Sequence, residues 1–389
     1  MDTIYFSAEH TDFRGEVERF LQREVVPFAH EWEEQRRVPR SAWKSLAGQG
    51  LLGLFHSPEV GGGGRDLFTT VVFLEELGRT GYGGVRAAVS VHAYMATYYL
   101  ARAGSAFLRE TYLAPAVAGD SIAALAITEP SAGADMAGIA TTAHREGDHF
   151  VLNGRKSMVS NGSSADFHVV VARTSLDSLG AAGLSLFVVD AATPGITVSR
   201  QETLGWRSAD PTMVDFEAVR VPERQLLGRP GSGFYHLMRG LQMERIVAAV
   251  LALGGMDACM HDLREHLRRR EAFGAKLGSF QAIRHRVADL ATELTAARQL
   301  VYHAAWRYQN DEMAAVDVCS MAKLQATELA VRVADTSVQL HGSHGYLDDT
   351  AVSRAYRDAR AATVAAGPSE VMRDIIARMA IDEAASRGH

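Results

Sequence analysis

The chain has 389 residues, of which 47% are hydrophobic, so it is long enough for two or three domains and too apolar for a disordered protein. Its formal net charge of −6 gives no reason to expect nucleic acid as a partner, and an anionic cofactor or substrate must be met by local basic groups. Cys259 and Cys319 are the only cysteines, which excludes a disulfide framework and predicts two buried free thiols. No run of about 18 consecutive apolar residues suggests a membrane span, and residues 1–13 do not have the pattern of a secretory signal. We therefore expect a protein of the reducing cytoplasm.

The first zone, residues 10–122, has the apolar spacing of helices. One predicted helical face recurs at three- and four-residue steps and comprises Phe13, Val17, Phe20, Leu21 and Val25. The four glycines at 61–64 lack the spacing and the trailing Lys-Ser/Thr of a P-loop. We interpret them as a connector between helices.

The middle zone, residues 123–228, changes to short strands separated by turn residues. The predicted strands lie at 150–152, 169–171, 184–189 and 196–198. Asn153-Gly154 directly follows the first of them and predicts a hairpin there. This zone is expected to be a small β-domain.

From about residue 233 the helical period returns in three long segments, at 234–269, 279–309 and 312–341. Long antiparallel helices form bundles, and such a bundle face often mediates oligomerisation. The order helix, strand, helix predicts an α+β protein with three domains. They are an N-terminal helical domain (1–122), a middle β-domain (123–228) and a C-terminal four-helix-bundle domain (229–389).

Four local motifs carry the strongest functional signal. They are 127–135 (ITEPSAGAD) followed by 153–156 (NGRK) and 160–162 (SNG); 204–208 (LGWRS) running into Val221-Pro222; 270–274 (REAFG) followed by 280–281 (FQ); and 339–346 (QLHGSHGY) followed by 357–359 (RDA). In this order and spacing the chain resembles the acyl-CoA dehydrogenase family along nearly its whole length. The resemblance implies the family's α+β fold and FAD as the cofactor.

In the middle zone, the resemblance implies that the segment from Leu125 to Ala134 lies along the flavin. Small residues in a turn let backbone N–H groups approach a cofactor closely. Thr128 would bond the pyrimidine side of the ring, Ser160 would lie near N5, and Met158 would cover a ring face where the family often has Trp. The cofactor residues implied here are Leu125, Ala126, Thr128, Ala134, Met158 and Ser160.

In the C-terminal zone, the resemblance implies that Arg270 binds the FAD diphosphate of a neighbouring subunit, as suits a planar guanidinium. The cofactor residues implied here are Arg270, Phe273, Phe280, Gln281, Gln339, Gly342, Ser343, Pro368 and Glu370. A Gly-Gly pair of the family pattern is Gly342-Ser343 in this chain. Such a shared site implies a homotetramer or dimer. The nearby cations Arg264, Arg268 and Arg269 are expected to form a solvated helix face.

The family's usual catalytic base is the first Glu of a Glu-Gly-Thr-Ser-Glu motif, and this chain has Ala366-Gly367-Pro368-Ser369-Glu370 there. Ala366 cannot accept a proton, although its backbone N–H can still serve an oxyanion hole. Glu370 matches a different family position. The protein is therefore inactive, catalyses a different reaction, or has its base elsewhere.

Glu244 is the alternative base. It lies on an otherwise apolar helical stripe formed by Leu237, Leu241, Ala248, Leu251 and Gly255. Burial raises the pKa of a carboxyl group, which suits a general base. The long-chain and isovaleryl branches of the family have their base in a Leu-x-x-Glu-Arg pattern, and residues 241–245 read LQMER. By the same resemblance, Arg245 and Ala134 would contact the substrate.

Together these features predict FAD-dependent α,β-dehydrogenation of an acyl-CoA to a 2-enoyl-CoA, with electron-transfer flavoprotein as the implied acceptor. Three alternatives stay open: a dehydrogenase of an acyl or aminoacyl group on an acyl-carrier protein in a biosynthetic pathway, a flavin monooxygenase, and a non-catalytic flavin-binding protein.

Overall fold

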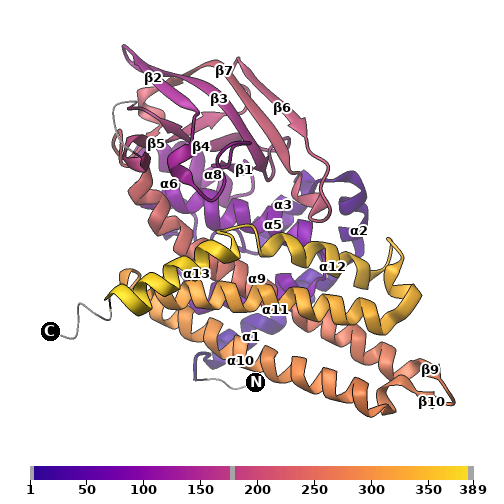
Figure 1. Ribbon diagram of the computed structural model, residues 1–389. Helices are drawn as coiled ribbons and strands as arrows, with labels where there is room; N and C mark the ends of the chain where they lie inside the picture. The colour runs from indigo at the N-terminus through magenta and orange to yellow at the C-terminus, as the bar shows by residue number, and fades with distance from the viewer. Residues whose placement is uncertain (1–3, 176–179, 384–389) are drawn as a thin grey trace. The chain divides into compact units, whose positions relative to one another are not determined.

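The computed structural model describes residues 4–175 and 180–383, drawn in chain order in Figure 1. Its contacts group the chain into two compact units. The sheet unit contains Phe28–Asp66 and Gly84–Met243, and the helical unit contains Met1–Pro27, Leu67–Gly83 and Glu244–His389. Each unit draws on the N-terminal helices, so the division into three domains stays a prediction.

The sheet unit is built around one eight-stranded sheet in the described chain. Its strands are β1 (Ala123–Ala126), β2 (Thr142–Glu146), β3 (His149–Val159), β4 (Phe167–Arg173), β5 (Leu184–Asp190), β6 (Ile196–Arg200), β7 (Thr212–Pro222) and β8 (Leu226–Leu227). The order across the sheet is β6-β7-β3-β2-β4-β5-β8, and β1 pairs parallel with β4. The switch to strands at the middle of the chain is thereby confirmed.

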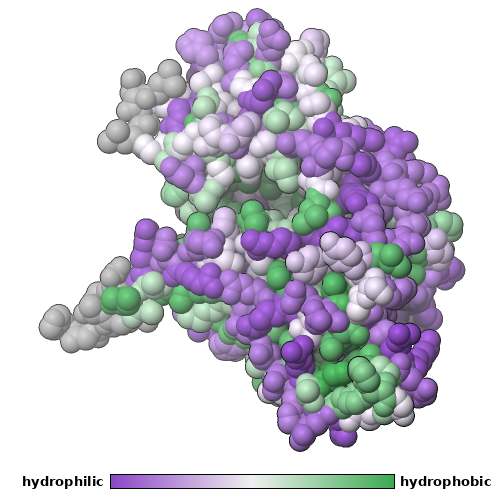
Figure 2. Space-filling view, turned by 45° about the vertical axis from the view of Figure 1, so that its right-hand side comes forward, coloured by the Kyte–Doolittle hydropathy of each residue, from purple (hydrophilic) through white to green (hydrophobic). Residues whose placement is uncertain are grey.

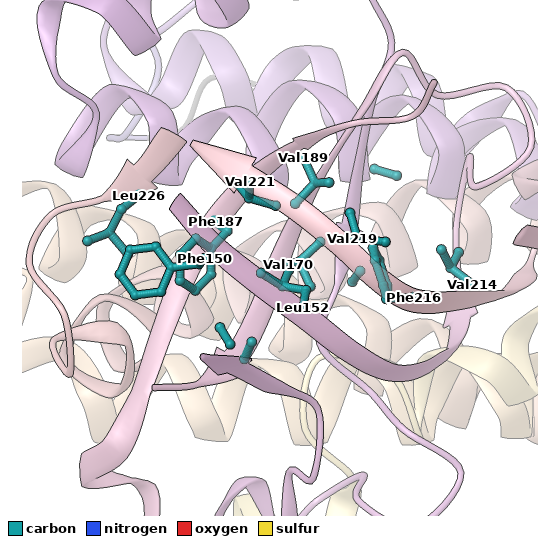
Figure 3. Packing of buried hydrophobic residues seen from close by; sticks show 14 of the residues in the cluster. Phe150, Leu152, Val170, Phe187, Val189, Val214, Phe216, Val219, Val221 and Leu226 are labelled. Carbon is teal, nitrogen blue, oxygen red and sulfur yellow. The ribbon is translucent and has the colours of Figure 1, made fainter. Parts of the chain in front are cut away.

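The core of this unit lies between the strands, where aromatic and branched side chains from distant segments meet (Figure 3). Phe150 of β3 and Phe187 of β5 pack edge to face, with ring centroids 5.0 Å apart. β4 and β5 are buried along almost their whole length, as their continuous apolar sequences require. The sheet is therefore a rigid support for the loops at its ends.

The Asn153-Gly154 hairpin prediction is wrong, because these residues lie inside β3. A bulge interrupts the pairing of β3 with β7 at this point, and Asn153 Oδ1 accepts a hydrogen bond from the Ala218 N–H at 2.8 Å. Gly154 has φ 153°, and a Cβ there would lie 2.4 Å from Thr141 Oγ1. Glycine is needed for this close approach of two strands, which local sequence cannot distinguish from a turn.

Short helices accompany the sheet. They are α2 (Val26–Gln35), α3 (Arg40–Gly48), η1 (Pro58–Val60), α5 (Gly83–Ser90), the π-helix η2 (Val91–Ala96), α6 (Thr97–Ala103), α7 (Ala106–Leu108), the π-helix η3 (Arg109–Leu113) and α8 (Ala114–Val117). His92 of η2 links two of the unit's segments: its Nδ1 accepts from the Ala123 N–H of β1 at 3.0 Å, and its Nε2 lies 3.1 Å from the Ala116 carbonyl oxygen. Burial lowers the pKa of His92 to about 4, so it is neutral and can accept that bond.

The helical unit is a bundle in which α10 and α11 lie side by side (Figure 1). Its helices are α1 (Ala8–Glu24), α4 (Leu67–Arg79), α10 (Gln281–Asn310), α11 (Val316–His341), α12 (Ala351–Ala362) and α13 (Ser369–Arg378), together with most of α9 (Gly233–Arg269). The small hairpin β9 (Glu271–Ala272) and β10 (Ala275–Lys276) separates α9 from α10. Figure 2 shows hydrophobic residues among hydrophilic ones at the lower end of this unit's visible face. The three long helices predicted from periodicity are confirmed.

Helix α4 is buried on every side from Leu67 to Gly78. Its Glu75 carboxylate is fully buried and bonds Arg14 at 2.8 Å, Arg298 at 2.5 Å and the Tyr302 hydroxyl at 2.7 Å. Because a buried charge is tolerated only when it is paired and hydrogen-bonded, this network fixes α4 against α1 and α10.

Helix α9 is long and apolar enough to cross a membrane by length and composition alone, but 67% of its most apolar window is buried inside the protein. That burial is the pattern of a core helix. The two cysteines are free and buried, as predicted. The exposed Arg268 and Arg269 both pair with Glu265, which agrees with a solvated helix face.

Candidate active site

In the sheet unit, the 127–141 loop that follows β1 is held by a buried ion pair. Lys156 Nζ lies 2.8 Å from Glu129 Oε1 and donates to the Ile127 carbonyl at 2.9 Å. Glu129 also accepts from the N–H groups of Ala140 and Thr141 at 2.7 and 3.0 Å. Contact with Lys156 and these hydrogen bonds outweigh burial and lower the pKa of Glu129. The Glu129 carboxylate thus joins the start of the loop to its end at Ala140 and Thr141.

The flavin-binding residues implied in the middle zone lie on or beside this loop. Leu125 and Ala126 end β1, and Thr128 follows as a half-buried residue whose carbonyl accepts from the Ser157 N–H at 2.8 Å. Ala134 is exposed farther along the loop. β1, β3 and the loop therefore bring Thr128 close to the chain segment that carries Met158 and Ser160.

The β3 end of this half-site has unusual backbone geometry. Met158 has φ 56° and Asn161 has φ 62°, so both non-glycine residues adopt the left-handed region. Met158 is 54% exposed, and its N–H donates to Gln201 at 2.8 Å. Asn161 is buried, and its side chain donates to the Ala88 carbonyl at 2.9 Å. Ser160 lies between these two fixed positions.

In the helical unit, Glu244 lies on α9 with 5% of its surface exposed. Three other members of the predicted stripe, Leu241, Ala248 and Gly255, are only half-buried. The other two members, Leu237 and Leu251, are buried, so the stripe is mostly covered with partial exposure beside Glu244. The burial of Glu244 agrees with the expectation for a base on an apolar surface.

Arg245, the next residue, is also 5% exposed, and its side chain contacts α11. Its Nη1 lies 3.4 Å from Ser320 Oγ of α11, and its buried Nε has no hydrogen-bond partner among the described residues. Burial lowers the pKa of Arg245, although Cys319 and Glu244 act in the opposite direction. The predicted contact of Arg245 with the substrate stays a prediction.

The 363–368 turn, between α12 and α13, holds the position where the family usually has its base. Ala366 has φ 53° and Gly367 has φ 94°, so two consecutive residues adopt left-handed values. The N–H groups of Val364 and Ala365 donate to the Ala361 carbonyl. Within the described residues, the Ala366 N–H donates to no protein group. The turn thus presents the free amide of the half-buried Ala366, and the Gly367 N–H likewise has no partner among the described residues.

The side chain of Lys323 on α11 donates hydrogen bonds to this turn. Its side chain is fully buried, and Nζ donates to the carbonyls of Gly367 at 2.7 Å and Thr363 at 3.4 Å. Burial lowers the pKa of Lys323 to about 8; Arg245 lowers it further, and Glu328 and Glu370 raise it. The ammonium therefore bonds both ends of the turn that contains Ala366.

The C-terminal residues implied in cofactor binding lie at the surface of the helical unit. Arg270 is exposed, and its guanidinium makes no ion pair with any described residue. Phe273 is 98% exposed, and its ring lies 6.5 Å from that of Phe280 in an edge contact. Exposed members of the implied set are Gln281, Gln339, Gly342, Ser343 and Glu370, while Pro368 is half-buried. An exposed guanidinium can take a phosphate, and an exposed aromatic ring can stack on a nucleobase.

Sequence reasoning missed the roles of three residues: Glu129, Lys156 and Lys323. Glu129 and Lys156 stand inside the quoted motifs, but the polar residues around Lys156 (Asn153, Arg155 and Ser157) give no local signal that its side chain is buried. Lys323 is flanked by apolar residues on a predicted helix, which is a signal of burial. That pattern does not identify the partner.

Three family models match the chain. Residues 7–120 match "Acyl-CoA dehydrogenase, N-terminal domain", residues 124–219 match the middle domain, and residues 231–381 match the C-terminal domain. The mitochondrial long-chain specific acyl-CoA dehydrogenase of Rattus norvegicus is 35% identical over 380 residues, covering 97% of this chain and 88% of the relative. The mitochondrial isovaleryl-CoA dehydrogenase of Pongo abelii is 35% identical over 376 residues, covering 96% and 88%.

Solved structures agree with these relatives. A crystal structure of an acyl-CoA dehydrogenase from Geobacillus kaustophilus has a TM-score of 0.94 at 35% identity, covering 98% of this chain and all (100%) of the other. The prolyl acyl carrier protein oxidase AnaB has a TM-score of 0.91 at 30% identity, covering 97% and 100%.

Proposed function

The chain belongs to the acyl-CoA dehydrogenase family, whose members are flavin-dependent oxidoreductases, and we propose that it converts a saturated acyl-CoA to the 2-enoyl-CoA. The observation that carries this proposal is the buried Glu244 on α9, combined with an alanine where the family usually has its base.

Glu244 would act as the general base that removes the α-proton. A buried carboxylate is a stronger base than an exposed one, because burial disfavours its charged form. Glu370 is exposed and lies in the first turn of α13, so it is a poor candidate for the same step. The proposal thus assigns the proton-abstraction step of the family's reaction to a single residue.

Ala366 would stabilise the negative charge that develops on the thioester oxygen. Its N–H is free among the described residues, and the left-handed turn keeps it from joining α12 or α13. Donors that are oriented in advance usually supply the largest part of such catalysis. The missing carboxylate at residue 366 therefore does not remove the oxyanion-binding group.

FAD is the cofactor we propose, and the described residues fit it. The loop held by Glu129, the half-buried Thr128 and the exposed face of Met158 suit the flavin ring, while the exposed Arg270 suits a diphosphate. When bound, FAD accepts the hydride from the β-carbon. Because Arg270 and its neighbours are at the surface, we also propose that they complete the site of another subunit in a homotetramer.

The test of the function is anaerobic mixing of the yellow holoprotein with short, medium, long and branched acyl-CoA thioesters. At least one of them should bleach the flavin absorbance in a stopped-flow experiment. A holoprotein that none of them bleaches would be a non-catalytic flavoprotein. Oxygen incorporation with an external reductant would instead indicate a monooxygenase.

The sharpest single test is Glu244→Gln, which keeps the shape of the side chain and removes its basicity. FAD should stay bound, and the rate of flavin reduction should fall about 10²–10⁴-fold or more, as for loss of a general base. The matched control is Glu370→Gln, which should change the rate far less. Wild-type reduction rates in Glu244→Gln would exclude Glu244 as the base.

An acyl or aminoacyl group on a carrier protein is the second candidate substrate. It is favoured by the likeness to the prolyl acyl carrier protein oxidase over nearly the whole of both chains. Comparison of one acyl group on CoA and on a carrier protein would decide between them. We further propose electron-transfer flavoprotein as the acceptor and the cytoplasm as the location.

A further inference from the structure

The 363–368 turn needs an external support to keep its shape. Ala366 at φ 53° is in a region that side chains with a Cβ disfavour, and Gly367 follows at φ 94°. Inside the turn, the Ser369 N–H bonds the Thr363 carbonyl at 3.1 Å. With the Val364 and Ala365 bonds to Ala361, this bond holds the two ends of the turn, but among the described residues no backbone group bonds the Gly367 carbonyl that follows Ala366.

Lys323 supplies that support. Its Nζ donates to Gly367 on one side of the turn and to Thr363 on the other. Among the described residues, carbonyl oxygens are its only hydrogen-bond partners, and no carboxylate pairs with it. A fully buried ammonium without a counter-ion is costly, and the hydrogen bonds to these two carbonyls are what the described residues offer to offset that cost.

We propose that Lys323 is a positioning residue of the thioester site, whose buried ammonium orients the Ala366 N–H toward the thioester carbonyl oxygen. This inference rests on the proposed function. Lys323 acts through the turn and touches neither substrate nor cofactor. The charged groups that act on it electrostatically are Arg245 on α9, Glu328 on α11 and Glu370 on α13.

The test uses Lys323→Met in the FAD-loaded protein. The probe is a trans-2-enoyl-CoA with ¹³C at its carbonyl, of the acyl type that reduces wild-type flavin fastest. Hydrogen bonding from Ala366 lowers the carbonyl stretching frequency in infrared difference spectra. Lys323→Met should lose most of that lowering, and its flavin reduction at saturating substrate should slow by about 10- to 100-fold, less than after loss of a complete oxyanion donor.

Arg332→Met is the matched control, because Arg332 is an exposed cation on the same helix. It should keep the wild-type carbonyl frequency. If Lys323→Met does not fold, Lys323→Gln retains one donor and should show an intermediate loss. A folded, FAD-loaded Lys323 variant with the wild-type carbonyl frequency would overturn the inference.

The same measurements separate this inference from the proposed function. If the wild-type protein neither bleaches nor lowers the carbonyl frequency, the proposed function is wrong. If the wild type does both and Lys323→Met does both equally well, only the role of Lys323 is wrong.

Discussion

Two lysines of the described chain are fully buried, one in each unit, and their partners differ. Lys156 in the sheet unit meets the Glu129 carboxylate at 2.8 Å, whereas Lys323 in the helical unit meets only carbonyl oxygens. Burial lowers the pKa of both ammonium groups to about 8. The two lysines therefore have similar pKa values although their hydrogen-bond partners differ.

The two lysines differ in the buried groups that would lose their partner if the lysine were replaced. Without Lys156, a buried carboxylate would lack its cation, whereas without Lys323 two neutral carbonyls would lack one donor. Loss of a charge partner is the more damaging event. We infer that the Glu129–Lys156 pair is mainly structural, while Lys323 can tune a catalytic turn at a smaller loss of stability.

The largest expected effect is that of Lys156→Met. Breaking a buried ion pair from one side typically destabilises a protein by about 3–5 kcal/mol. Urea denaturation followed by circular dichroism would measure it, with the exposed Lys44→Met as a control that should change little. A loss below that of Lys323→Met would reverse the comparison.

The double variant Glu129→Gln/Lys156→Met should be more stable than Lys156→Met alone. Removing the stranded charge should recover about 1–3 kcal/mol, because the amide can still accept from the loop N–H groups. A double-mutant cycle in the same denaturant measures the coupling. Simple additivity of the two single changes would show that the charges do not interact.

Lys323→Met should destabilise the protein by about 1–3 kcal/mol, the usual range for leaving buried polar groups without a hydrogen bond. The helical unit should lose stability while the far-ultraviolet spectrum stays native. Equal losses for both lysine variants would mean that the carbonyl contacts matter as much as the ion pair.

The last expected effect is a pH dependence of this loss. The pKa of Lys323 is lowered from 10.5 to about 8, so between about pH 8 and 10.5 the unfolded chain holds a proton that the folded chain has released. Stability contributed by this lysine therefore rises with pH in that window, by at most about 1.4 kcal/mol per pH unit. The deficit of Lys323→Met relative to wild type should thus be larger at pH 10 than at pH 7. Subtraction of the two proteins removes the titration of all shared groups, and a deficit independent of pH would contradict the shift.

The sequence could predict what local patterns determine. Helical periodicity identified α9, α10 and α11, and the apolar stripe around Glu244 predicted its burial. Asn153-Gly154 shows the limit, because a turn dipeptide also fits a bulge where only the neighbouring strand reveals the difference.

The supports of the site depend on contacts between distant segments. Glu129 and Lys156 are 27 residues apart, and Lys323 and Gly367 are 44 apart. A single sequence shows each of these residues only in its local setting and cannot show which other segment it meets. For the same reason, periodicity could not show that α4 packs with the C-terminal helices.

The assembly of the helical unit from Met1–Pro27, Leu67–Gly83 and Glu244–His389 has a consequence for synthesis. At about 5–20 residues per second, a ribosome needs about 15–60 s between finishing α4 and finishing α13. For most of that interval α4, which is buried on every side in the folded protein, lacks its partner helix α10, and its Glu75 lacks Arg298. Nascent and truncated chains therefore expose an aggregation-prone helix. Fragments that end before α10 should depend on chaperones or precipitate.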